Sequence, residues 1–198
     1  MLDELKKYLS KYVEMSPAEL SVLEPLLEFR NYDKKVKLTD IGEQEIYVNF
    51  VVKGLARKYF YKGKEEIIVQ IAKEGDLISS SVSFLSDSPS TYVIDTIEPT
   101  IFISLSKQSL DELHLSSPKW QRAGRLIMTD FLIEQENWEL DRIKYTTKER
   151  FVRFVGANSE LFQRVPQKYL ASYLNIQPET FSRLKHFLRK KVVENNLS

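Results

Sequence analysis

Hydrophobic residues alternate with a period of two through the middle of the chain, and helical patterns lie on both sides of this region. Between about residues 29 and 105 the clearest alternating runs are 46–52, 67–71 and 101–105. This period places alternate side chains on one face of a β-strand, so each run predicts a strand with a buried face. Residues 61–64 (YKGK) have the composition of a tight hairpin. We therefore expect an antiparallel double-stranded β-roll, similar to a jelly roll, in an α+β chain.

Helix-initiation signals mark the rest of the chain. Residues 16–19 (SPAE) form a capping box with a proline at the first helical position, and residues 146–149 (TTKE) form a second capping box. Between them, Ser117-Pro118 starts a long helix that is expected to run to about Tyr145. These signals predict three parts, which cover residues 1–115, 116–145 and 146–198.

The absence of cysteine excludes several kinds of site. The chain has no disulfide, no thiolate nucleophile, no cysteine-ligated zinc and no cysteine-ligated iron–sulfur cluster. The charged N-terminal segment lacks the apolar core of a signal peptide, and no segment approaches the roughly 20 apolar residues needed to cross a bilayer. We therefore expect a cytoplasmic protein that has no membrane partner.

The hydrophobic residues of the long helix lie on more than one face. One stripe has coiled-coil spacing and consists of Trp120, Gly124, Ile127, Phe131 and Trp138. Other apolar residues, such as Met128 and Leu132, lie off this stripe. A helix that is apolar on several faces must bury two surfaces. We expect one surface to pack on the β-roll and the stripe to pack on the same helix of a second copy in a homodimer. The alternative is a core helix in a monomer.

Charge is divided unevenly between the two ends of the chain. Residues 147–198 contain ten basic and four acidic residues, a net charge of +6, whereas residues 1–146 carry −5. A basic C-terminal part joined to an acidic body favours a polyanionic partner for the C-terminal part.

Residues 167–185 have the pattern of two helices joined by a short turn. Pro166 suits the start of the first helix, Asn175 tolerates a left-handed turn conformation, and Pro178 suits the first turn of the second helix. The residues that would pack the two helices together are Leu170, Leu174, Ile176, Phe181 and Leu184. The segment therefore predicts a helix-turn-helix in which residues 178–190 lie in the major groove of DNA.

The polar residues of this segment have the chemistry of a DNA reader. Arg183 can donate two parallel hydrogen bonds to guanine, and Glu179, one turn earlier, can accept one from the amino group of cytosine. We predict that these two side chains read bases. The residues predicted to contact the DNA backbone are Gln167, Lys168, Thr180, Ser182, Lys185 and Arg189. The alternative is a solvated helix face on which Glu179 and Arg183 form an ion pair.

The order of β-roll, long helix and helix-turn-helix resembles the Crp/Fnr family of bacterial transcription regulators. The resemblance rests on residues 51–57 (VVKGLAR), 74–78 (EGDLI) and 165–184, which run from VPQK to SRL. It implies a homodimer whose paired long helices place two recognition helices on successive major grooves of a palindromic site. It matches Glu179 and Arg183 to base-contacting positions, and it makes double-stranded DNA the expected partner, with RNA polymerase as a further candidate.

Two departures from this family concern the effector and the wing. Cyclic-AMP-binding members carry a Gly-Glu pair and an arginine where this chain has Ser79, Ser80 and Ser90. A serine hydroxyl cannot replace the two charged hydrogen bonds that an arginine makes with phosphate, so the resemblance does not extend to cyclic AMP. The chain also stops at Ser198, so we expect the wing after the recognition helix to be shortened or absent.

The sequence does not identify an effector. A candidate pocket for a small polar effector consists of Ser79, Ser80, Ser81, Ser90 and Thr91, and the alternative is a loop that binds nothing. We expect no cofactor, and the two histidines, His114 and His186, are interpreted as ordinary surface or packing residues.

Catalysis is not expected. A cupin-like metal site in the roll needs clustered histidines, but none precedes His114, and neither a Ser-His-Asp arrangement nor a phosphate-binding glycine loop is visible. We therefore predict no catalytic residue and no metal site. The alternative to a DNA-binding regulator is a β-roll module that binds a ligand or a protein without sequence-specific DNA binding.

Overall fold

The structure is a computed structural model that describes residues 2–195, and their side chains up to residue 188. The chain divides into two compact units. Unit 1 consists of Met1–Phe60 and Val69–Leu132, and unit 2 consists of Tyr61–Ile68 and Ile133–Ser198. The predicted domain limits near residues 115 and 145 stay a prediction, because the unit boundary falls within the long helix.

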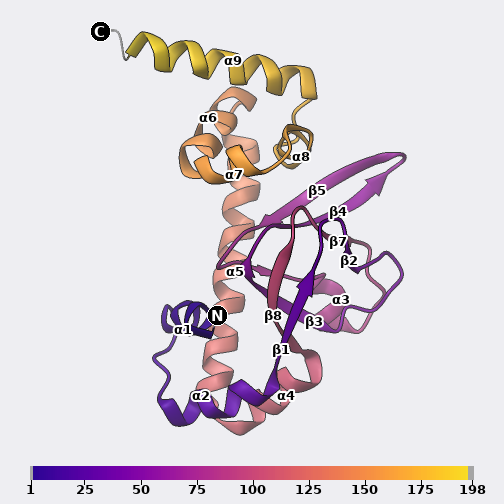
Figure 1. Ribbon diagram of the computed structural model, residues 1–198, viewed down its shortest axis with the longest axis vertical. Helices are drawn as coiled ribbons and strands as arrows, with labels where there is room; N and C mark the ends of the chain where they lie inside the picture. Colours follow the sequence, from indigo (N-terminus) through magenta and orange to yellow (C-terminus); the bar gives the residue numbers. More distant parts are fainter. Residues whose placement is uncertain (1, 196–198) are drawn as a thin grey trace. The chain divides into compact units, whose positions relative to one another are not determined.

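The strands form two four-stranded sheets. The first has the order β1-β8-β3-β6 and comprises β1 (Leu27–Tyr32), β8 (Thr100–Ser106), β3 (Tyr47–Lys53) and β6 (Leu77–Ile78). The second has the order β2-β7-β4-β5 and comprises β2 (Lys37–Thr39), β7 (Val93–Thr96), β4 (Ala56–Lys62) and β5 (Glu65–Ala72). Neighbouring strands pair antiparallel, with Leu27 opposite Leu105 and Ala56 opposite Thr96. The expected antiparallel roll is confirmed (Figure 1).

Helices precede and follow the strands, and one short helix lies between β6 and β7. They are α1 (Leu2–Ser10), α2 (Pro17–Leu23), the 3₁₀ turn η1 (Glu24–Leu26), α3 (Ser81–Ser86), α4 (Lys107–Ser116), α5 (Pro118–Lys144), α6 (Thr147–Ala157), α7 (Ser159–Arg164), α8 (Gln167–Tyr173) and α9 (Pro178–Asn195). The expected long helix is therefore confirmed as α5. Among the described helices, none combines the length and the hydrophobicity that a membrane span requires.

Local sequence signals start several of these helices as expected. Ser16 caps α2: its hydroxyl accepts from the backbone N–H of Glu19, whose carboxylate accepts from the backbone N–H of Ser16 at 2.7 Å. The same carboxylate accepts from Nζ of Lys119 at 2.8 Å, and these bonds lower the pKa of Glu19 to about 2. Thr146 caps α6 with an equivalent capping box to Glu149. Both capping boxes confirm the sequence prediction.

The core of unit 1 has two clusters. One is packed between the first sheet, α1 and α5 and contains Leu5, Leu9, Leu23, Phe50, Ile103, Leu113, Trp120 and Ala123. The other contains Val51, Ala56, Ala72, Ile78, Ile94 and Phe102. Successive residues Phe50 and Val51 point into different clusters, because side chains alternate along β3. The Tyr12 hydroxyl also donates to Oδ2 of Asp130 at 2.6 Å, which ties the segment after α1 to α5.

Candidate nucleic-acid interface

An aromatic cluster positions the helices of unit 2. Phe151 of α6 is fully buried and meets Phe181 of α9 edge to face, with ring centres 5.1 Å apart. Phe162 of α7 packs near both rings, at 6.1 Å from each. Because these three rings come from three helices, they fix α9 against α6 and α7.

The turn between α8 and α9 has the predicted left-handed residue. Asn175 has a φ of 53°, a conformation that asparagine adopts more readily than most residues. The N–H of Ile176 donates to the carbonyl of Ala171 at 2.9 Å, and the N–H of Asn175 donates to that of Ser172 at 3.0 Å. Of the five apolar residues predicted to join the helices, Leu170, Leu174, Ile176 and Phe181 are buried and Leu184 is half-buried. The segment is therefore a helix-turn-helix.

The outer face of this motif carries the residues that the sequence singled out. Glu179, Ser182 and Arg183 are exposed on α9, and Gln167 and Lys168 are exposed at the start of α8. This arrangement keeps the predicted base readers on one solvent-facing side of α9 and leaves the predicted phosphate contacts of α8 accessible. Exposed arginine and glutamate side chains have the chemistry to hydrogen-bond to base edges.

Arg183 is held by a neighbour on its own helix. Its Nη2 donates to Oγ1 of Thr180 at 3.2 Å, and among the described side chains it forms no ion pair with Glu179. The alternative of a closed Glu179–Arg183 pair is therefore not the arrangement in this structure. Both charged groups face solvent without neutralising each other.

Two of the residues predicted to contact the DNA backbone are half-buried and already interact with other side chains. Lys185 is half-buried, and its ammonium lies 5.5 Å from the centre of the Phe162 ring, in cation–π geometry. Thr180 is half-buried and accepts the hydrogen bond from Arg183. The side chain of Arg189 lies outside the described residues.

Sequence reasoning missed Ser172, the residue that joins α8 to the hairpin of unit 2. Its hydroxyl donates to the carbonyl of Glu66 at 2.8 Å and accepts from the N–H of Ile68 at 3.0 Å. Residues 61–68 are the tip of the β4–β5 hairpin, and they group with α8 in unit 2. A serine within a predicted helix gives no sign in the sequence of a partner more than 100 residues away.

The apolar faces of α5 differ from the expected stripe. Trp120 is only 3% exposed and lies in the unit 1 core, and a Cβ on Gly124 would come within 2.6 Å of Nε2 of His114. Trp138 stacks on Tyr173 of α8, with ring centres 4.8 Å apart. These three residues therefore pack within one chain, which leaves Ile127 and Phe131 half-buried on the predicted stripe.

A different row of apolar residues on α5 is exposed. It consists of Met128, Leu132, Ile133, Leu140 and Ile143. Leu132 is 61% exposed and Ile143 is 80% exposed. Large apolar side chains at helical spacing on one exposed face mark a surface suited to another helix.

The residues of the predicted effector pocket form hydrogen bonds within the chain. Oγ of Ser90 lies 2.8 Å from Oγ of Ser80, and Oγ of Ser79 donates to the carbonyl of Tyr47 at 3.0 Å. Ser81 begins α3, and Thr91 is exposed. The effector pocket stays a prediction, and the hydroxyls of Ser79 and Ser90 have hydrogen-bond partners within the chain.

Two buried charged groups next to these serines were not foreseen. Nζ of Lys58 donates to the carbonyl of Ser79 at 3.1 Å, and burial lowers the pKa of Lys58 to about 8. The carboxylate of Glu45 accepts from Oγ1 of Thr39 at 2.7 Å and from the N–H of Tyr47 at 3.0 Å. Lys58 follows Arg57, which is also buried. Because successive side chains of a strand point to opposite faces, alternation predicts that only one of the adjacent residues Arg57 and Lys58 is buried.

Solved structures with a similar fold include bacterial regulators. The chain is similar to the c-di-GMP-responsive global regulator CLP of Xanthomonas campestris, with a TM-score of 0.69 and 14% identity over 89% of this chain and 93% of that chain. It is similar to FixK2 from Bradyrhizobium japonicum, with a TM-score of 0.69 and 21% identity over 83% and 85%.

The catabolite activator protein of Thermus thermophilus is also similar, with a TM-score of 0.57 and 19% identity over 94% of this chain and 88% of that chain. No protein-family model and no curated protein sequence matches the chain. These three identities are all below 25%, so the similarity concerns the fold. The chain therefore has the fold of the Crp/Fnr-type regulators, as the resemblance of its motifs predicted.

Proposed function

We propose that this protein is a DNA-binding transcriptional regulator that acts as a homodimer and reads a palindromic site through α9. The observation that carries the proposal is the helix-turn-helix of unit 2, whose α9 presents Glu179 and Arg183 to solvent. The net charge of +6 on residues 147–198 attracts the DNA backbone. The fold that this chain shares with bacterial regulators also supports the proposal.

Base readout would use charged side chains that α9 presents to solvent. Arg183 exchanges its bond to Thr180 for two parallel bonds to guanine O6 and N7, and Glu179 accepts from a cytosine amino group. Lys168 and Gln167, exposed at the start of α8, contact phosphates and set the register of α9 in the groove. Thr180, Ser182 and the other predicted phosphate contacts have the same positioning role.

The homodimer would form through α5. The exposed row that includes Leu132 and Ile143 can pair with the same row of a second copy, which buries apolar side chains that are otherwise solvated. A symmetric dimer carries two copies of α9, and a two-fold protein axis demands a palindromic site. We propose no catalytic role, and we propose the cytoplasm, with its DNA and RNA polymerase, as the place of action.

Binding-site selection with the purified full chain tests the proposal. We expect one palindromic sequence to be enriched from random DNA. Arg183→Ala should cost about 1–3 kcal/mol and relax specificity at one base position in each half-site. Lys168→Ala should instead weaken binding to all sequences equally and reduce the slope of the salt dependence by about one.

A chain without DNA affinity even at low salt would overturn the regulator proposal. That result would favour the alternative, a β-roll module that binds a ligand or another protein. Enrichment of a single half-site would contradict the symmetric dimer.

A further inference from the structure

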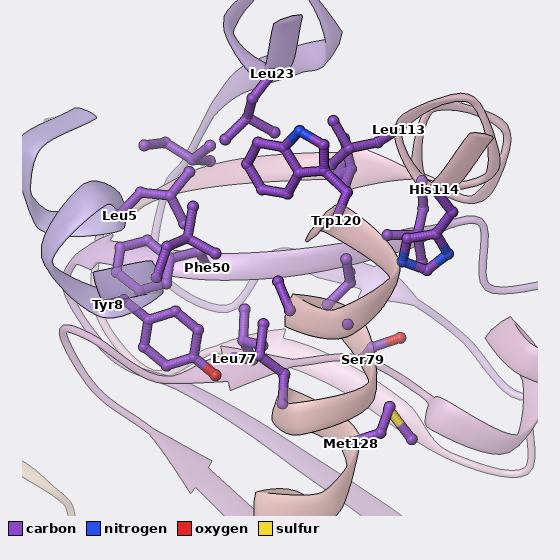
Figure 2. A pocket seen from close by; sticks show the side chains of 18 of the residues that line it. Leu5, Tyr8, Leu23, Phe50, Leu77, Ser79, Leu113, His114, Trp120 and Met128 are labelled. Carbon is purple, nitrogen blue, oxygen red and sulfur yellow. The ribbon is translucent and has the colours of Figure 1, made fainter. Parts of the chain in front are cut away.

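A cavity of about 340 Å³ lies in unit 1, between α1, the first sheet and the first half of α5 (Figure 2). Leu5 and Tyr8 of α1, Phe50 and Leu77 of the sheet, and Trp120 of α5 surround it. Protein cores are close-packed and contain few voids larger than a water molecule. A volume in the range of small-molecule sites, among the residues of the main core cluster, therefore indicates a binding site rather than ordinary packing.

The lining of this cavity is almost wholly apolar. Its polar contributors are Tyr8, Ser79, Ser81, His114 and Arg125, and no acidic residue lines it. The hydroxyl of Ser79 donates to the carbonyl of Tyr47, so it is already satisfied. Since a sugar or a nucleotide would lose its hydrogen bonds to water in such a cavity, the lining selects an apolar ligand.

One end of the cavity is lined by exposed residues. Three lining residues, Leu85, Arg125 and Met128, are exposed, which marks the side where the cavity meets solvent. Arg125 is the one lining residue with a permanent charge, and among the described residues no carboxylate pairs with its guanidinium. Arg125 is exposed on α5 on this side of the cavity, and an arginine there can bind a carboxylate through two hydrogen bonds.

We propose that this cavity binds a linear aliphatic carboxylate, such as a medium-chain fatty acid. The hydrocarbon chain occupies the apolar interior between α1 and α5, and the carboxylate lies at Arg125. A chain atom takes up about the space of a water molecule, so the volume accommodates a chain of roughly ten carbons. The proposal does not depend on DNA binding, because every lining residue belongs to unit 1.

The length of the ligand provides the first test. The full chain is titrated calorimetrically with hexanoate, octanoate, decanoate and dodecanoate below their micelle concentrations. We expect the affinity to rise about fourfold with each added methylene, the equivalent of about 0.8 kcal/mol, until the cavity is full, and then to level off. Absence of binding by all four acids, or affinity that does not change with length, would overturn the proposal.

Matched variants provide the second test. Arg125→Gln should weaken decanoate binding about tenfold and leave 1-decanol binding unchanged, because the alcohol carries no charge. The control is Arg122→Gln, an exposed arginine on the same helix that does not line the cavity. Equal effects of the two substitutions on decanoate would refute the assigned position of the carboxylate.

Filling the cavity provides the third test. Ile127→Trp places a larger side chain in the lining, whereas Leu126→Trp alters the neighbouring half-buried residue, which does not line the cavity. With folding verified by circular dichroism, Ile127→Trp should abolish decanoate binding and Leu126→Trp should retain it. A chain that binds haem, with an absorption band lost in His114→Ala, but binds no fatty acid would also overturn the proposal.

Discussion

The ammonium nitrogen of Lys58 lies 3.1 Å from the carbonyl oxygen of Ser79 inside the β-roll, and the Lys58 residue is only 8% exposed. Burial is the main cause that lowers the pKa of Lys58, to about 8, and the charge of Glu45 acts in the opposite direction. The folded chain therefore disfavours the charged lysine that the unfolded chain retains up to its ordinary pKa.

This difference predicts how stability depends on pH. Between pH 8 and 10.5 the unfolded chain holds the Lys58 proton and the folded chain has lost it, so stability should rise with pH. Below pH 8 Lys58 is charged in both states, and burying this charge lowers the free energy of unfolding by about 3 kcal/mol. Lys58→Met should remove this rise in urea unfolding experiments, whereas the exposed control Lys62→Met should keep it. A rise of the same size in both variants would contradict the prediction.

A buried ion pair supports the second sheet. Nε and Nη2 of Arg57 donate to the two carboxylate oxygens of Asp95 at 2.7 and 2.8 Å, and both side chains are less than a tenth exposed. Asp95→Asn removes the charge of the carboxylate that accepts both of these buried hydrogen bonds, so it should cost about 3–5 kcal/mol of unfolding free energy.

The matched control for this variant is the exposed pair Lys37–Asp40, in which Asp40→Asn should cost at most about 1 kcal/mol. Replacing both buried partners, in Arg57→Met with Asp95→Leu, should restore most of the stability. Urea unfolding measures all three. Equal losses from Asp95→Asn and Asp40→Asn would count against a structural role for the buried pair.

Gly54 occupies a position that no other residue fits. Its φ is +102°, and a Cβ there would lie 2.5 Å from the carbonyl oxygen of Pro99 and 2.6 Å from Oγ1 of Thr100. Gly63 has a φ of +62° in the β4–β5 hairpin, with open space around a Cβ. Gly63→Ala should cost about 1–2 kcal/mol for the left-handed backbone, and Gly54→Ala should cost clearly more because of the added clash. Similar unfolding midpoints for the two variants would be evidence against this difference.

The exposed row of α5 predicts the oligomeric state. The full chain should sediment at about twice its mass of 23.2 kDa at micromolar concentration. Leu132→Glu combined with Ile143→Glu should give the monomer mass, because two like-charged rows would face each other. The control is Leu115→Glu on α4, which is 84% exposed but lies outside the row, and it should remain dimeric. A dimer that survives the double substitution would place the interface elsewhere.

Some of the structure could be predicted from the sequence because it depends on neighbours in the chain. The capping boxes at Ser16 and Thr146 each use residues three positions apart, and the positive φ of Asn175 follows from its side chain and the turn around it. The alternation of apolar residues predicted the roll, and the apolar spacing in residues 167–185 predicted the buried face of the helix-turn-helix. In each case the physical cause acts within a few residues.

Other features depended on which distant residues meet, and only the tertiary structure decided them. The roll buries Lys58 beside Ser79, α8 brings Ser172 to Glu66, and packing on unit 1 assigns Trp120 to the core while Leu132 stays exposed. Periodicity shows that α5 has two apolar faces, but which face meets its own sheet depends on the shape of the core around Phe50. The cavity beside Arg125 arises in the same way, because a void is the space that side chains from separate elements fail to fill.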